Sequence, residues 1–172
     1  MIALSMQSNL FSGDLSGWIL PSSLTYIQIS FNQFTGNISN WIIPNSLLSI
    51  NIAGTSSYYF SGDLSGWILP NGTTRFYSDY NRFTKLPRGA YNSLDSSIGY
   101  YAVRANANTS ELDSLLADID SYATTHTPLN SSRFVLSGTG NGIPSADGLA
   151  SKASIENKWA KAGYVATITV NS

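Results

Sequence analysis

Apolar and polar residues alternate in short stretches along the first half of the chain, and the stretches recur at a nearly constant distance. In one of them, Ile27 and Ile29 alternate with polar neighbours. A period of two is typical of a β-strand with one buried face. Similar stretches contain residues 4–6, 50–52 and 76–78. The pattern therefore predicts one short strand in each repeating unit.

The segment that follows each predicted strand is itself repeated. Phe11-Ser-Gly-Asp-Leu-Ser-Gly-Trp18-Ile-Leu-Pro21 returns unchanged at residues 60–70, and a looser copy, FTGNISNWIIP, occupies residues 34–44. Successive copies are about 23–26 residues apart. A fixed period of this size is the signature of a solenoid, in which each coil buries its apolar side only by stacking on its neighbours.

The second unit shows what each position of a coil is expected to do. Asn32 follows the strand where the chain turns inward, and its amide can bond both its own turn and the neighbouring coil. Stacked asparagines would then form a ladder that satisfies buried peptide groups. We expect the convex side to be filled by Phe34, Ile38, Trp41 and Ile42, and the chain to bend at Gly36 and Pro44.

Residues 24–38 follow the pattern L-x-x-I-x-I-x-x-N-x-F-x-G-x-I. This pattern resembles the leucine-rich repeat, and its N-x-F-x-G-x-I half is similar to plant-type and bacterial surface variants. The resemblance covers most of the chain, with specific matches in the first four units and looser ones after residue 98. It implies an α/β fold: a right-handed β-α/loop superhelix with a parallel concave sheet, used as a binding scaffold.

We expect one solenoid over residues 1–172, with short repeats in 1–97 and longer, helix-containing repeats with a closing cap in 98–172. In the third unit Thr55 replaces the asparagine, and extra residues within 56–59 predict a bulge. Ser110, with Asp113 three residues on, is the expected N-cap of a first helix with an apolar face of Leu112, Leu115, Leu116, Ile119 and Tyr122. A second helix is expected from Ala146 to Ala162, with apolar residues Leu149, Ala153, Ile155 and Trp159, then Gly163 at C′ and a last strand over Tyr164–Val170.

The composition narrows the function. Charged residues make up 11% of the chain, the net charge is −1 and cysteine is absent. The charge excludes an electrostatic footprint for nucleic acid or an anionic membrane, and no apolar run reaches the ~20 residues of a membrane span. Residues 1–72 hold only Asp14 and Asp63 as charged side chains. Such a surface fits an extracellular or cell-surface protein, although no signal peptide is visible.

The residues that flank the buried strand positions are expected to form rows on the concave face. The first row is Ala3, Tyr26, Ser49, Arg75, Tyr100, Arg133; the second is Ser5, Gln28, Asn51, Tyr77, Ala102, Val135; the third is Gln7, Ser30, Ala53, Asp79, Arg104, Ser137. Tyr and Arg are enriched at binding hot spots. The predicted binding residues are Tyr26, Gln28, Arg75, Tyr77, Asp79, Tyr100, Arg104 and Arg133. In the alternative interpretation Asp79 and Arg104 only pair across strands, and the tyrosines only cover the sheet.

Other chemistry-bearing residues favour plain structural roles. Arg75, Arg82, Lys85 and Arg88 fit a solvated rim better than an anion site. Asp14 and Asp63 fit turns better than a calcium ladder, which needs six to eight oxygens. His126 is the only histidine, and Gly138-Thr-Gly140-Asn-Gly142 departs from the dinucleotide-binding spacing. We therefore expect no catalytic set, no metal site, no cofactor and no enzyme activity.

The favoured function is non-catalytic recognition, in which a surface or secreted protein binds a protein or glycan, as in adhesion, through the concave face or the Tyr58/Tyr59 bulge. The alternative is a structural or assembly segment of a larger surface or virion protein. Met1 aligns with Leu24, so the chain begins at a repeat boundary without a polar cap. Terminal repeats normally need such a cap, which indicates a fragment or self-association through the first coil.

Overall fold

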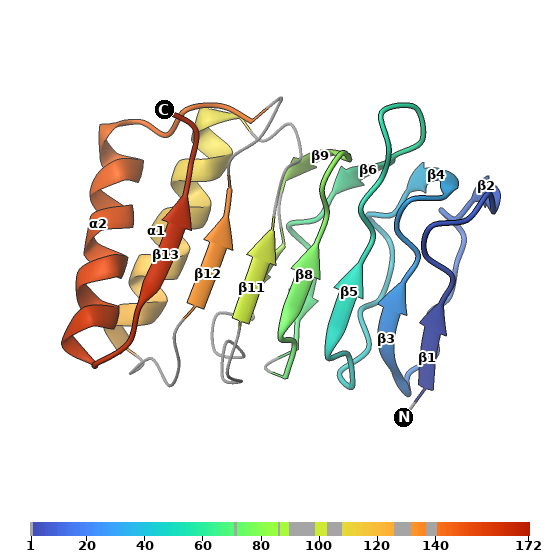
Figure 1. Ribbon diagram of the computed structural model, residues 1–172, viewed down its shortest axis with the longest axis horizontal. Helices are drawn as coiled ribbons and strands as arrows, with labels where there is room; N and C mark the ends of the chain where they lie inside the picture. Colours follow the sequence, from blue (N-terminus) through green and yellow to red (C-terminus); the bar gives the residue numbers. More distant parts are fainter. Residues whose placement is uncertain are drawn as a thin grey trace.

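The computed structural model describes residues 2–70, 72–85, 87–89, 99–102, 108–125, 132–136 and 141–172. Seven strands form one sheet in the order β1-β3-β5-β8-β11-β12-β13, which runs along the whole molecule (Figure 1). All neighbouring strands are parallel. The chain is therefore a parallel β-solenoid, as the repeat predicts. The strands are β1 (Ile2–Ser5), β3 (Leu24–Gln28), β5 (Ser49–Asn51), β8 (Arg75–Tyr77), β11 (Gly99–Ala102), β12 (Ser132–Val135) and β13 (Ala166–Thr169).

A second parallel sheet forms the opposite wall of the first four coils. It consists of β2 (Ser12–Asp14), β4 (Gln33–Asn37), β6 (Phe60–Asp63) and β9 (Arg82–Lys85), and a two-residue pair, β7 (Ile68–Leu69) with β10 (Arg88–Gly89), lies beside it. The sequence predicted only filling and turns here. Because the peptide groups of stacked coils need partners, the repeated Ser-Gly-Asp stretches pair with the next coil as strands.

The core lies between the two walls and continues beneath the helices. Ile27, Ile50 and Phe76 come from the large sheet, while Phe34 and Trp41 come from the opposite side, and all are buried. The expected filling is thus confirmed for Phe34, Ile38 and Trp41. It is wrong for Ile42, whose side chain is 83% exposed. Trp41 and Ile42 are adjacent in an extended segment, so when one points inward the other must point outward.

The predicted asparagine ladder is present. Asn32 Nδ2 donates to Met6 O (2.7 Å) in the preceding coil and to Ile29 O (3.1 Å) in its own, and Asn32 Oδ1 accepts from Phe11 N (3.2 Å). Each amide therefore closes its own turn and ties it to the previous coil. Asn81 repeats the arrangement two coils later.

Helix α1 (Thr109–Thr125) buries the predicted face of Leu112, Leu115, Leu116 and Ile119. Its N-cap is not Ser110. Asn108 Oδ1 accepts from Glu111 N at 2.9 Å, so the helix begins two residues earlier than the capping motif indicated. An asparagine is as good a cap as a serine.

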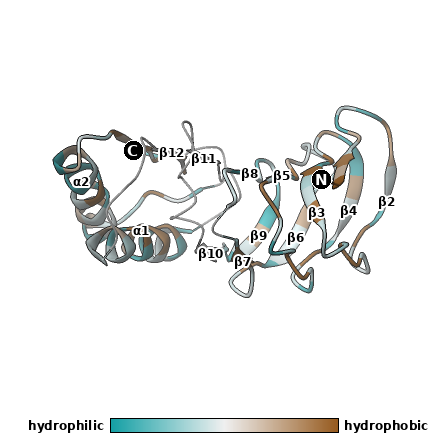
Figure 2. Cartoon of the chain, turned by 90° about the horizontal axis from the view of Figure 1, so that it is seen from below, coloured by the Kyte–Doolittle hydropathy of each residue, from teal (hydrophilic) through white to brown (hydrophobic). Residues whose placement is uncertain are grey.

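Helix α2 (Ala146–Lys161) follows Ser145, whose hydroxyl accepts from Gly148 N, and Gly163 takes the expected left-handed C′ conformation with φ 83°. Ile155 and Trp159 are buried as predicted, but Leu149 and Ala153 are exposed. The apolar stripe is narrower because α2 packs on α1 along one side, where Lys158 Nζ reaches Asp120 Oδ1 at 2.7 Å. Both helices lie at the C-terminal end of the solenoid (Figure 2).

Candidate binding surface

The strand register assembles the first two rows predicted from the sequence. Tyr26 is paired with Ala3 on one side and Ser49 on the other, and Arg75 follows Ser49. Tyr100 continues the row between Arg75 and Arg133. In the second row Gln28, Asn51, Tyr77 and Ala102 are paired in the same way.

The third row is described in part. Backbone bonds connect its coils in order, with Ser8 N donating to Ser30 O (2.9 Å) and Gly54 N donating to Asp79 O (2.8 Å). Arg104 lies outside the described residues, so the alternative interpretation, in which it pairs with Asp79, is not tested. For Tyr100 and Arg133 the structure describes the place in the strand and its pairing, but not the side chain.

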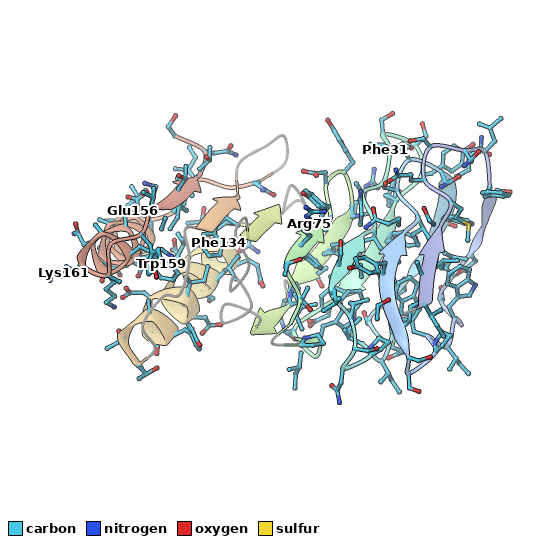
Figure 3. All side chains as sticks on the ribbon, turned by 60° about the horizontal axis from the view of Figure 1, so that its bottom comes forward. Phe31, Arg75, Phe134, Glu156, Trp159 and Lys161 are labelled. Carbon is cyan, nitrogen blue, oxygen red and sulfur yellow. The ribbon has the colours of Figure 1, made fainter. Side chains whose placement is uncertain are left out.

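The rows differ in how far their side chains reach solvent. Arg75 is exposed and extends from β8 (Figure 3), while Tyr26, Gln28, Tyr77 and Asp79 are half-buried. Ser30, Ser49 and Ala53 are buried, which contradicts the expectation that every row residue is open to solvent. These small side chains are covered by larger neighbours. Gln28, for example, donates from Nε2 to Ser49 Oγ at 3.1 Å.

The predicted bulge is a closed turn after β5 that rises beyond the C-terminal ends of the neighbouring strands (Figure 1). Thr55 N donates to Tyr58 O at 2.7 Å, and Thr55 Oγ1 accepts from Tyr58 N at 3.0 Å. Thr55 therefore satisfies the backbone of this turn at the position where the other coils use asparagine. Tyr58 is exposed, and the Arg82 guanidinium lies 4.0 Å from the centroid of the Tyr59 ring.

The basic residues near this region do not gather on one spot. Arg82 and Lys85 both belong to β9, but Arg82 stacks on Tyr59 while Lys85 Nζ lies 2.9 Å from Asp63 Oδ2 of β6. With these cations already engaged, the arrangement fits the rim interpretation better than a phosphate site.

Asp14 and Asp63 form turns, as predicted. Asp63 Oδ1 accepts from Ser65 N (2.9 Å) and Ser65 Oγ (2.5 Å), and Asp14 accepts the equivalent pair from Ser16. The hydroxyl of Ser65, the Lys85 ammonium and the Ser65 N–H together lower the pKa of Asp63 to about 2. The Ser16 hydroxyl and N–H lower the pKa of Asp14.

A metal site requires several ligating side chains close together. Among the described residues, no group of three or more His, Cys, Asp or Glu side chains could hold a metal ion. His126 and residues 137–140 lie outside the described residues, so the interpretations given to His126 and to the glycine-rich turn remain predictions.

Two exposed aromatic residues were missed by the sequence reasoning. Phe31 and Tyr80 occupy the same position of their coils, one residue before the ladder asparagine, and both have left-handed backbones, with φ 54° and 61°. Their side chains are 48% and 54% exposed. Their place before each asparagine was visible in the sequence, but the outward direction depends on the turn.

Neither the family models nor the curated proteins and solved structures compared with this chain gave a match. Within the part of the chain that the structure describes, no helix has the length and apolar character of a membrane span.

Proposed function

We propose that this chain is a leucine-rich-repeat recognition module that binds a protein or glycan through the concave, outer face of its seven-stranded sheet. The observation that carries the proposal is the contrast between the two sides of the large sheet. Its buried side repeats Ile, Leu and Phe from coil to coil. The positions on its other side change from coil to coil: the half-buried Tyr26, the small buried Ser49 and the exposed Arg75 are paired in one row. Because stacking of the coils does not restrict which residues occupy these positions, they can vary to recognise a particular partner.

The leucine-rich-repeat type rests on the asparagine ladder and on the pattern that contains it. Asn32 and Asn81 bond the preceding coil in the same way, which is the role that the resemblance implies for the asparagine of N-x-F-x-G-x-I. A fold by itself does not determine a partner, so the ligand class must come from the surface residues. Tyr26, Arg75 and Tyr77 supply the aromatic and guanidinium groups that anchor many interfaces.

The proposed role is non-catalytic, in a surface or secreted protein. The chain has one histidine and no nucleophile-elbow motif. Its nearly uncharged first 72 residues suit an exposed, neutral surface.

The test is a ligand screen with the purified chain, using cell-surface protein extracts and printed glycans, followed by affinity measurement with the ligand found. Arg75→Ala combined with Tyr77→Ala should weaken binding by more than about tenfold, the loss expected when hot-spot residues are truncated. The matched control is Ile42→Ala, an exposed side chain on the other wall. Unchanged affinity of the double variant, with circular dichroism showing an intact fold, would contradict the proposal.

A second candidate function is assembly through the first coil. Phe11 is 52% exposed, whereas the equivalent Phe34 and Phe60 are 8% and 3% exposed. Leu4 and Met6 are likewise only partly buried. In this candidate function, a second molecule of the same protein packs on these side chains of the first coil, in the way that each coil packs on its neighbour. Light scattering should then show a dimer that Phe11→Asp abolishes and Ile42→Asp leaves intact; a monomer at high concentration removes this candidate.

A further inference from the structure

Three residues with exposed aromatic side chains have their backbones close to Gly54, just beyond the C-terminal end of β5. Phe31 N donates to Ala53 O (3.0 Å), which places Phe31 beside the residue before Gly54. A Cβ atom on Gly54 would lie 2.8 Å from Tyr58 O and 3.0 Å from Tyr80 O. Phe31, Tyr58 and Tyr80 come from three successive coils, and we call this group the aromatic edge.

Phe31 and Tyr80 hold backbone conformations that bulky residues rarely adopt, because a left-handed turn brings Cβ close to the carbonyl oxygen. Backbone conformations of this kind are unfavourable for residues other than glycine, and they cluster at functional sites. Ser8 occupies the equivalent turn position in the first coil with φ 57°. In these three coils the residue before the asparagine takes a positive φ, and Ser8 shows that this position does not need an aromatic ring.

The third coil contributes to the same edge through its insertion. Insertions in repeat proteins form loops on one face, which is often the binding face. Here the extra residues form the closed turn 55–58, which brings Tyr58 between the coils of Phe31 and Tyr80. The Arg82 guanidinium on the Tyr59 ring holds the base of the insertion against the fourth coil. The aromatic edge is thus built on backbone that is fixed before a ligand arrives, which lowers the cost of ordering on binding.

From these observations we infer that the aromatic edge is a subsite for a neutral oligosaccharide, an inference that rests on the proposed recognition function and names its ligand class. Tyr and Phe rings offer flat apolar faces to the C–H faces of sugar rings, and the exposed Ser56 and Ser57 offer hydroxyls beside Tyr58. Phe31 and Tyr80 are two coils apart, about 10 Å at the usual strand spacing. With that separation, the two aromatic rings can each contact a different sugar unit of one oligosaccharide, which a single monosaccharide cannot provide.

Charge favours a neutral glycan over an acidic one. The three aromatic residues and the two serines carry no charge, and the nearby guanidinium of Arg82 is already stacked on Tyr59. An acidic glycan would need a free cation at the edge, since a buried or half-buried anion without a partner is costly. Residues 1–72 contain no Lys or Arg to supply one.

The test uses immobilised cello-, chito-, manno- and xylo-oligosaccharides, from disaccharide to hexasaccharide, with sialylated glycans as the acidic comparison. Tyr58→Ala and Tyr80→Asn should each weaken binding of the best oligosaccharide by about tenfold or more, the loss of one aromatic anchor. Because Asn tolerates the left-handed conformation, Tyr80→Asn should keep or raise the unfolding temperature. A loss of affinity at undiminished stability separates recognition from a structural role.

Controls distinguish failure of this inference from failure of the proposed function. Ile42→Ala, also an exposed apolar side chain, should bind like the wild type. Binding lost in the Arg75→Ala/Tyr77→Ala variant but kept in Tyr58→Ala and Tyr80→Asn would overturn the aromatic-edge subsite and leave recognition through the sheet in place. No binding to any of the neutral oligosaccharides would overturn the ligand class, and a protein ligand lost in the edge variants would reassign the edge to a protein.

Discussion

The indole rings of Trp41 and Trp67 lie nearly parallel in an offset stack, with 6.1 Å between their centroids and 7° between their planes. Trp18 continues the stack on the other side of Trp41, at 6.2 Å and 12°. The repeated Trp-Ile-Leu-Pro segment is therefore a packing device that ties three coils together. The two buried indoles are not equivalent, however. Trp41 Nε1 donates to Leu15 O at 3.0 Å, while Trp67 Nε1 has no partner among the described residues.

This difference gives the first prediction. Trp41→Phe and Trp67→Phe remove similar apolar volume, but only the first also removes a hydrogen bond. Trp41→Phe should lower the free energy of unfolding by about 1 kcal/mol more than Trp67→Phe, the net worth of a buried hydrogen bond. Denaturant unfolding of both variants measures the gap. Equal losses would show that the indole N–H of Trp41 contributes nothing to stability.

The asparagine ladder gives the second prediction. Asn81→Ala removes the amide that bonds Ile52 O (2.8 Å) and Phe60 N (2.7 Å), and it leaves both peptide groups buried without this partner. We expect a loss of about 2–4 kcal/mol in the free energy of unfolding, since each orphaned buried group costs ~1–3 kcal/mol. Asn9→Ala is the matched control, because Asn9 is exposed. It should cost less than about 1 kcal/mol, and a cost equal to that of Asn81→Ala would refute the ladder.

A third prediction concerns the close approach of two coils at Gly36. This residue has φ 132°, and a Cβ atom there would lie 2.5 Å from Asp14 Oδ1 and 2.9 Å from Ser16 N. Gly13 has a similar φ of 142° with nothing within 4 Å. Gly13→Ala therefore tests backbone strain alone, about 1–3 kcal/mol. Gly36→Ala adds the displacement of the Asp14 turn and should cost about 1–3 kcal/mol more; thermal unfolding of the two variants compares them.

The fourth prediction is a pH dependence. The folded-state pKa of Asp63 is lowered from 3.8 to about 2, first by the Ser65 hydroxyl and then by Lys85. A lowered pKa means that the ionised carboxylate stabilises the fold above pH 3.8, and that this stabilisation disappears as the pH falls toward 2. Asp63→Asn keeps an acceptor for Ser65, as Asn37 does for Ser39 in the second coil. The variant should lose less stability than the wild type between pH 4 and pH 2.

Lys85→Gln serves as the control for the Asp63 prediction. It removes the exposed ion pair, which contributes at most about 1 kcal/mol, and keeps the Ser65 bonds that are the main cause of the lowered pKa. Most of the acid-dependent loss should therefore remain in this variant. If Asp63→Asn lost as much stability as the wild type between pH 4 and pH 2, the loss would have to come from other carboxyl groups, which would contradict the prediction.

Much of this fold follows from periodicity. Ile27 and Ile29 alternate with polar residues, and an extended segment with one buried face places both isoleucines in the core and their polar neighbours on the other side. The register of Tyr26, Ser49 and Arg75 followed from aligning the repeats, because stacked coils of similar length place equivalent residues side by side. The sequence missed the second sheet, since Ser-Gly-Asp has low strand propensity and pairs only because a neighbouring coil offers the same backbone.

The sequence by itself determined the repeating unit, the buried strand positions and the asparagine ladder, because burial and peptide hydrogen bonding act on every coil alike. Only the tertiary structure decided the rest. Stacking determined that Trp41 is buried and Ile42 exposed, and that the Ser49 hydroxyl accepts from Gln28 of the preceding coil. It also brought Phe31, Tyr58 and Tyr80 together around Gly54. Residues so far apart in the chain become neighbours only through the spacing of parallel coils.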